Sequence, residues 1–177
     1  LLTILKKYIK ESKDIRFEGN GYSDEWAAEA EKRGLSNIKT TPKALDALVS
    51  EKSTELFSKL NIFNTRELHA RHEILLESYF KKLQIEARVM GEVANSLIIP
   101  AVISYQNTLI ENAKGLKELG LSAEAIATPL AIINKLSDHL SIVKTSIDEM
   151  LEQRKKVNSI EESREKAIAY DEKVKSY

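Results

Sequence analysis

The sequence contains no cysteine, few prolines and glycines, and no long apolar run. Without cysteine there are no disulfides, no thiolate metal site and no cysteine nucleophile, which fits a reducing cytoplasm. The most apolar stretch, residues 97–103 (LIIPAVI), contains a proline and falls far short of the roughly 18 residues of a membrane span. We therefore expect a cytoplasmic protein with no membrane partner.

An excess of charge of either sign is also missing, because 27 Lys and Arg residues balance 27 Asp and Glu residues. A dedicated nucleic-acid binder shows a basic excess, so nucleic acid is not an expected partner. A net charge of zero also removes the repulsion between copies of the chain, which makes association easy.

Alternation of polar and apolar residues is absent too, and apolar residues instead recur every three or four positions, which predicts an all-α fold. The first part reads as short capped helices. Residues 1–13 form one, Ser23 caps a second that ends before a left-handed Gly34, and Thr41 caps a third, with Pro42 in its first turn. We expect this third helix to continue to Leu60.

A much longer helix is predicted from the capping-box spacing Asn64-Thr65-Arg66-Glu67 to Leu119. Pro100 lies inside it, and we expect a kink there, because the periodicity continues across the proline. The apolar side is predicted to contain Leu68, His72, Leu75, Tyr79, Leu83, Glu86, Met90, Ala94, Leu97, Ala101, Tyr105, Leu109, Ala113 and Leu116.

A reversal at residues 120–122 leads into a second long helix, capped by either Ser122 or Thr128-Pro129. Asn158-Ser159 ends it, and a third helix begins near Ile160. Because long helices joined by short turns lie antiparallel, we predict a long helical hairpin with a third helix returning along it.

No motif points clearly to chemistry. His69 and His72 could touch one metal from a single helix, but the stronger two-histidine motif has its ligands four residues apart, so ordinary helix histidines are the favoured interpretation. Gly19-Asn20-Gly21 lacks the further signature of a phosphate loop and reads as a turn. We therefore predict no catalytic, cofactor-binding or metal-binding residue.

The acidic pairs Asp148-Glu149 and Glu161-Glu162 are assigned no role, because paired catalytic carboxylates need a cleft and a thin helical bundle rarely offers one. The basic run at residues 154–156 suits the end of a helix. Trp26 is expected to pack its short helix against neighbouring residues.

One stretch of the sequence resembles a known protein family. Residues 16–57, RFEGNGYSDEWAAEAEKRGLSNIKTTPKALDALVSEKSTELF, resemble the C-terminal part of the type III glutamine synthetases. The similarity continues over residues 67–90, 98–120 and 165–174 and is weakest over residues 121–160. Residues 41–48, TPKALDAL, also resemble the last helix of other glutamine synthetases.

The resemblance implies a parent enzyme that joins ammonia to glutamate with ATP through a γ-glutamyl phosphate. It further implies divalent Mg or Mn, a place in nitrogen metabolism, the cytoplasm and large ring homo-oligomers. The family's catalytic and metal-binding motifs do not occur in this sequence, so the segment alone is expected to be inactive and to hold no cofactor.

The resemblance also divides the chain. Residues 1–64 would be the tail of the synthetase catalytic domain, and residues 65–177 the long-helix extension, which packs on the catalytic domain and neighbouring subunits. Leu1 is not a methionine and Tyr177 lies within a helical pattern, so we expect a piece of a longer protein. The alternatives are a free-standing helical interaction module and, less favoured, a metal-binding bundle.

Overall fold

The structure is a computed structural model that describes the backbone of residues 1–177 and every side chain except that of Ile15. The described residues form helices and no strand, so the all-α prediction is confirmed. The chain divides into two compact units, residues 1–39 and residues 40–177.

The first unit holds α1 (Leu2–Glu11), the short helix η1 (Lys13–Ile15) and α2 (Asp24–Lys32). As predicted, the Ser23 side chain accepts a hydrogen bond from the backbone N–H of Trp26, and Gly34 ends α2 with a φ of 72°. The Trp26 ring packs on Phe17 with centroids 4.4 Å apart, which confirms its expected packing role.

The second unit begins with α3 (Thr41–Leu45), η2 (Asp46–Val49) and α4 (Glu51–Lys59). The prediction of one helix from Thr41 to Leu60 was therefore wrong. Ser50 adopts an extended backbone (φ −60°, ψ 153°), and its hydroxyl accepts from the N–H of Ser53, which starts a new helix. The predicted cap was also one residue late, because Thr40 occupies the N-cap position of α3.

A continuous helix of 54 residues follows, made of α5 (Thr65–Val93), the π-helical segment η3 (Ala94–Ile98) and α6 (Ile99–Glu118). The predicted capping box is present, with Asn64 and Glu67 bonding each other's backbone N–H. Among the described residues, this helix is long and apolar enough by length and composition alone to cross a membrane. Only 17% of its most apolar window is buried.

The predicted apolar stripe of this helix was partly wrong. The side chains of Leu75, Met90, Leu97 and Tyr105 are exposed, whereas Leu76, Phe80, Ala87 and Gly91 are buried. Before η3, α5 turns the neighbouring positions Leu76 and Gly91 inward in place of Leu75 and Met90. A π turn contains one extra residue, so η3 shifts the inward face of the residues that follow it, such as Tyr105. The helix continues past Pro100, which lies in the first turn of α6 directly after η3.

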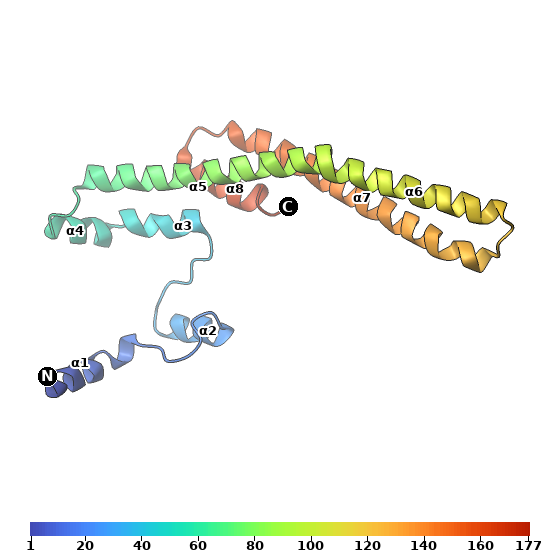
Figure 1. Ribbon diagram of the computed structural model, residues 1–177. Coiled ribbons are helices and arrows are strands. Elements are labelled where there is room, and N and C mark those ends of the chain that lie inside the picture. The colour runs from blue at the N-terminus through green and yellow to red at the C-terminus, as the bar shows by residue number, and fades with distance from the viewer. The chain divides into compact units, whose positions relative to one another are not determined.

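The chain reverses at Gly120, whose φ is 77°, and α7 (Ala123–Asn158) runs back along α6. Ser122 is the N-cap residue of α7, and Pro129 lies inside the helix, which decides between the two predicted starts. The predicted break at Asn158 and the third helix, α8 (Ser163–Lys173), are confirmed. Figure 1 shows the α6–α7 hairpin extending beyond the place where α8 packs against α5.

The second unit has two regions with different packing. The base consists of α3, η2, α4, α5, α8 and the part of α7 from Lys144 onward, and the arm consists of η3, α6 and α7 up to Val143. The main buried cluster lies almost wholly in the base. Its large members are Leu76, Phe80, Ile147, Met150, Val157, Tyr170 and Val174.

Candidate functional site

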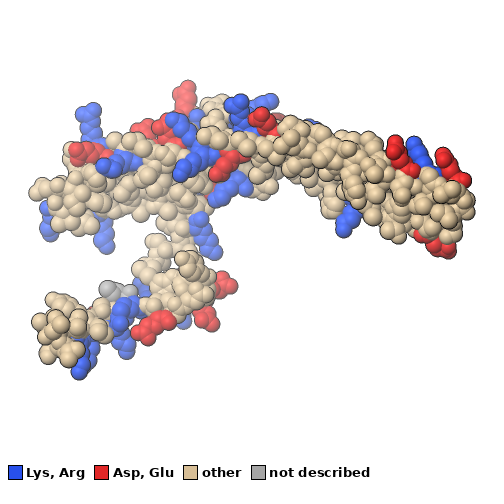
Figure 2. Space-filling model, viewed as in Figure 1, with Lys and Arg blue, Asp and Glu red and all other residues tan. Residues whose placement is uncertain are grey.

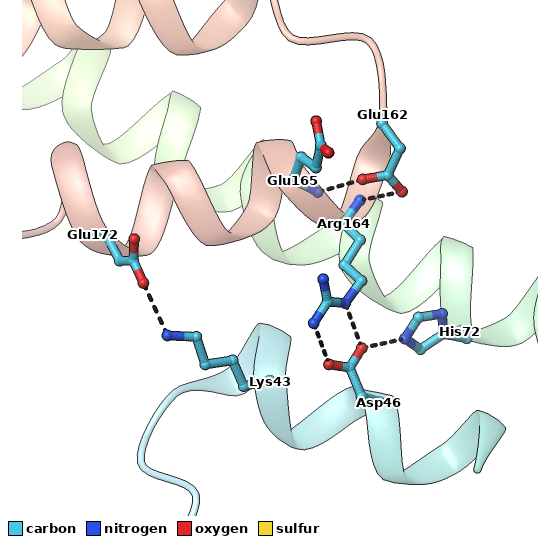
Figure 3. Close-up of polar contacts among 7 residues, drawn as sticks. All are labelled: Lys43, Asp46, His72, Glu162, Arg164, Glu165 and Glu172. Carbon is cyan, nitrogen blue, oxygen red and sulfur yellow. Dashed lines mark hydrogen bonds and ion pairs between the residues drawn. The ribbon is translucent and has the colours of Figure 1, made fainter.

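Polar side chains join η2 to α8 on the surface of the base (Figure 3). The guanidinium of Arg164 donates two hydrogen bonds to Asp46, from Nε to Oδ1 at 2.8 Å and from Nη2 to Oδ2 at 2.7 Å. This two-pronged geometry is the strong form of an Arg–carboxylate pair. It connects residues that are 118 positions apart in the sequence.

His72 reaches the same carboxylate from α5. Its side chain is only 11% exposed, and its Nε2 lies 3.5 Å from Asp46 Oδ1, longer than a well-formed hydrogen bond. Asp46 thus lies between a guanidinium on one helix and an imidazole on another. We call Asp46, His72 and Arg164 the clasp.

The hydrogen bonds within the clasp stabilise the ionised forms of Asp46 and Arg164. The bonds from Arg164 lower the pKa of Asp46, although burial works in the opposite direction. The same bonds raise the pKa of Arg164. Both groups therefore stay ionised at neutral pH.

A second set of pairs lies further along α8. Lys43 Nζ is 2.9 Å from Glu172 Oε1, with both side chains about half exposed. Asp171, only 9% exposed, accepts from the hydroxyl of Tyr79 and from Lys175. Burial raises the pKa of Asp171, but the two hydrogen bonds together with the charges of Lys175 and Lys43 lower it overall.

The start of α8 is fixed by caps and by a buried polar contact. The Glu162 carboxylate accepts from the N–H groups of Arg164 and Glu165, which satisfies the free donors of the first turn. Asn158 Oδ1 accepts from the Tyr170 hydroxyl at 2.5 Å and from Gln84 Nε2 at 3.2 Å. These contacts set the position from which Arg164 reaches Asp46.

The two histidines singled out in the sequence do not share an environment. His69 is exposed, whereas His72 is buried against Asp46. Among the side chains that the structure describes, no three His, Asp or Glu residues converge into a group that could hold a metal ion.

The other candidates have structural surroundings. Asn20 Oδ1 accepts from the Tyr22 N–H in the Gly19–Gly21 turn, and the Asn20 carbonyl accepts from the Ser23 hydroxyl. Asp148 pairs with Lys144 at 2.6 Å, and Glu162 caps α8. These contacts account for the turn, for Asp148 and for Glu162 by local structure.

Lys156, in the basic run at the end of α7, pairs with Glu152 at 2.7 Å one turn earlier. Sequence reasoning missed the clasp altogether. Asp46 lies in the short helix η2 and Arg164 in the first turn of α8, and no spacing signal links two residues that far apart. Only the tertiary packing of α8 on α3, the helix directly before η2, brings their side chains together.

Comparisons with known proteins give one consistent result. A family described as "Glutamine synthetase C-terminal domain" matches residues 1–117. The chain is 42% identical, over its whole length, to "Glutamine synthetase" of Bacteroides fragilis (strain YCH46). It is 34% identical, over 87% of its length, to "Type-3 glutamine synthetase" of Dictyostelium discoideum. It spans only 25% and 20% of the length of these two relatives.

Proposed function

Because the chain belongs to the glutamine synthetase family through its C-terminal domain, we propose that it is the structural C-terminal segment of such an enzyme. The parent reaction would be the ATP-dependent ligation of ammonia to glutamate through a γ-glutamyl phosphate. Mg²⁺ or Mn²⁺ and ATP would bind elsewhere in the parent, since no residue of this chain is assigned to them.

The observation that carries the structural role is the clasp. Residues 41–48 resemble the end of the catalytic domain, and Asp46 in that region is held by Arg164 from the last helix of the chain. Breaking one partner of such a pair leaves a partly buried charge without compensation. In our proposal, the clasp fixes the long helices to the segment around Asp46, which would belong to the tail of the catalytic domain, residues 1–64.

The long helices, residues 65–177, would then serve as an extension that packs on the parent's catalytic domain and on neighbouring subunits of a cytoplasmic ring. The apolar surface of the arm supports this role, because large exposed apolar patches mark interaction sites. The same surface also suits the second candidate, a free-standing helical interaction module. The family match favours the first.

The proposal is tested with the full-length parent enzyme carrying Arg164→Glu, which places a carboxylate against Asp46. We expect sedimentation velocity to show less assembled enzyme and glutamine synthesis to fall in the same proportion. The KM values for glutamate and ATP should stay unchanged. Exchanging the charges with Asp46→Arg and Arg164→Asp together should restore part of the assembly.

A fall in kcat with assembly intact would contradict a purely structural role. The isolated 177-residue chain offers a second check. We expect no glutamine from glutamate, ammonia and ATP, and measurable turnover by the pure chain would show that catalytic residues lie within it.

A further inference from the structure

The arm carries a large apolar surface that its own helices do not cover. Among its described residues, the buried apolar side chains are Ala94 and Ala113, both small. The larger apolar side chains of α6 and of the first part of α7 remain partly or largely exposed. A helix pair buries only one strip of each helix, so the flanks of these strips need another partner.

One flank of the arm forms a mainly apolar stripe. On the α6 side it contains Ile98, Val102, Tyr105 and Leu109, which recur at steps of four, three and four. On α7 it contains Ile132, Leu136 and Val143, and the exposed His139 lies on the same face between the last two. Helical geometry places each set on one face of its helix.

Both sets lie on the same side of the hairpin. The seam between α6 and α7 is marked by Gln106, whose Nε2 donates to Ser137 Oγ at 2.6 Å. A groove on one side of this seam is lined by residues of both helices, including Ile110, Lys114 and Leu130. At 100° per residue, Tyr105 and Leu109 turn away from Ile110, and Ile132 and Leu136 turn away from Leu130, to the opposite flank.

Several members of the apolar stripe are exposed, and the remainder are half-buried. Tyr105 is 54% exposed, Ile98 49% and Ile132 39%, although these are large apolar side chains. Residues 93–110 contain no charged side chain at all. On the face drawn in Figure 2, the middle of the arm is largely uncharged, and most of the visible charges of the arm lie towards its tip.

The size of this face suits a specific but weak interface. Residues 98–116 span ~27 Å of helix at 1.5 Å per residue. Two adjacent helices present a face about 20 Å wide. The face therefore covers on the order of 500 Å² per copy, and two copies would bury about 1,000 Å², the lower end for a specific protein interface.

We propose that the apolar stripe binds the same stripe of a second copy of this chain, so that two arms form a four-helix bundle about a two-fold axis. This rests on the proposed function, in which the long helices join subunits. A face shared by two antiparallel helices is self-complementary when a copy is placed against it by a two-fold rotation. Paired hairpins of this kind are a standard helical bundle.

The charge of the arm favours a second copy over a lipid surface. Residues 94–143 contain three lysines and four carboxylates, a formal charge of −1. Helices that lie on anionic membranes are instead rich in Lys and Arg on their polar face. A near-neutral arm meets no electrostatic repulsion from its copy.

The test is sedimentation equilibrium of the 177-residue chain from about 1 to 200 μM. We expect a monomer–dimer equilibrium with a Kd on the order of 10 μM, as the small buried area implies. Tyr105→Glu places a carboxylate at the centre of the interface and should raise the Kd at least about 30-fold. Ser104→Glu adds the same charge at the neighbouring exposed position of α6, outside the apolar stripe, and should leave the Kd within about twofold.

Circular dichroism of both variants should show the helicity of the original chain, which separates loss of association from loss of fold. If Tyr105→Glu does not fold, Ile132→Lys on the facing helix provides the same test. A chain that stays monomeric to 200 μM, or a dimer that survives Tyr105→Glu, would overturn the proposal.

Flotation with phosphatidylcholine–phosphatidylglycerol vesicles examines the lipid alternative. We expect the chain to remain unbound, and flotation that is lost in Tyr105→Glu would show that the stripe meets lipid. If the 177-residue chain stays monomeric while the parent enzyme still loses assembly with Arg164→Glu, the dimer inference is wrong and the proposed function stands. Loss of kcat in the assembled parent would count against the proposed function instead.

Discussion

The base and the arm are built from the same two long helices, yet they are stabilised in different ways. In the base, α5 meets α3, η2, α7 and α8, and α7 also meets α8, so that Leu68, Tyr170 and Ala167 are fully buried. In the arm, α6 and α7 have only each other, and Tyr105 remains 54% exposed. The number of helices that pack on a segment, more than its own sequence, decides how much of its apolar surface is buried.

The difference also separates two kinds of polar contact. The base places charged pairs between helices that are distant in the sequence, such as Arg164 with Asp46 and Lys43 with Glu172. In the arm, Gln106 bonds Ser137 between neutral side chains. Charged pairs at the edge of a closed core fix orientation, whereas the uncharged face of the arm is free of the desolvation cost that charges would add on binding.

The largest expected contrast comes from removing the same residue type in the two regions. Tyr170→Ala should lower the free energy of unfolding by about 3–5 kcal/mol, because Tyr170 is fully buried and stacks near Phe80. Tyr105→Ala in dilute solution should cost less than about 1 kcal/mol, because over half of this side chain already meets water. Urea unfolding below the dimer Kd measures both.

Tyr170→Phe serves as the control for the hydroxyl alone and should cost about 1 kcal/mol, since it removes one hydrogen bond to Asn158. Equal losses for the two alanine variants would mean that the arm has a core of its own.

The clasp should make the stability of the base depend on pH. The folded-state pKa of Asp46 lies below the value of about 3.9 expected when the chain is unfolded. Its contribution is therefore complete above that value and is lost as the pH falls through the folded pKa. Because the pair is partly exposed, we expect about 1 kcal/mol at most.

Urea unfolding at pH 7 and pH 3 tests this contribution in the original chain and in Asp46→Asn. The variant should lose less stability between the two pH values than the original chain does. Glu149→Gln, at an exposed carboxylate of α7, is the matched control and should reproduce the original profile. An Asp46→Asn profile identical to the original would show that the clasp does not contribute to the pH dependence of stability.

The smallest expected effects come from two helical glycines. A Cβ at Gly115 in the arm meets no atom within 4 Å, so Gly115→Ala should stabilise the chain by about 0.5–1 kcal/mol through helix propensity. A Cβ at Gly91 in the base would lie 2.8 Å from Leu151 Cδ2, so Leu151 must move to admit it. Gly91→Ala should therefore gain less than Gly115→Ala or lose stability.

Thermal unfolding of the two glycine variants provides the comparison. A larger gain for Gly91→Ala than for Gly115→Ala would show that the base packs more loosely at Leu151 than the structure indicates.

Local sequence rules predicted the parts of the fold that depend on local chemistry. The Ser23 cap, the left-handed Gly34 and the Asn64–Glu67 capping box all follow from side chains that bond the nearby backbone. The antiparallel hairpin followed from a short turn at Gly120 between two long periodic segments. Each of these signals lies within a few residues of the feature that it predicts.

Other features depend on contacts that sequence spacing does not reveal. The π turn at residues 94–98 shifts the inward face, so Tyr105 was placed in the core although it is exposed. The helix breaks at Ser50 although the apolar repeat continues across it, because the Ser50 side chain caps a new helix there. The clasp needs three helices in place at once, so neither Asp46 nor Arg164 could be singled out beforehand.

Hydrogen exchange of the 177-residue chain at two concentrations, one below and one above the dimer Kd, tests the central claim most directly. The account predicts that amides of the base keep the same protection at both concentrations. Amides of α6 and of α7 up to Val143 should exchange faster in the dilute sample and gain protection in the concentrated one. The claim is that the base is stabilised by its own packing, whereas the arm is stabilised by a second copy. It would be contradicted if the arm in the dilute sample were as protected as the base and its protection did not change with concentration.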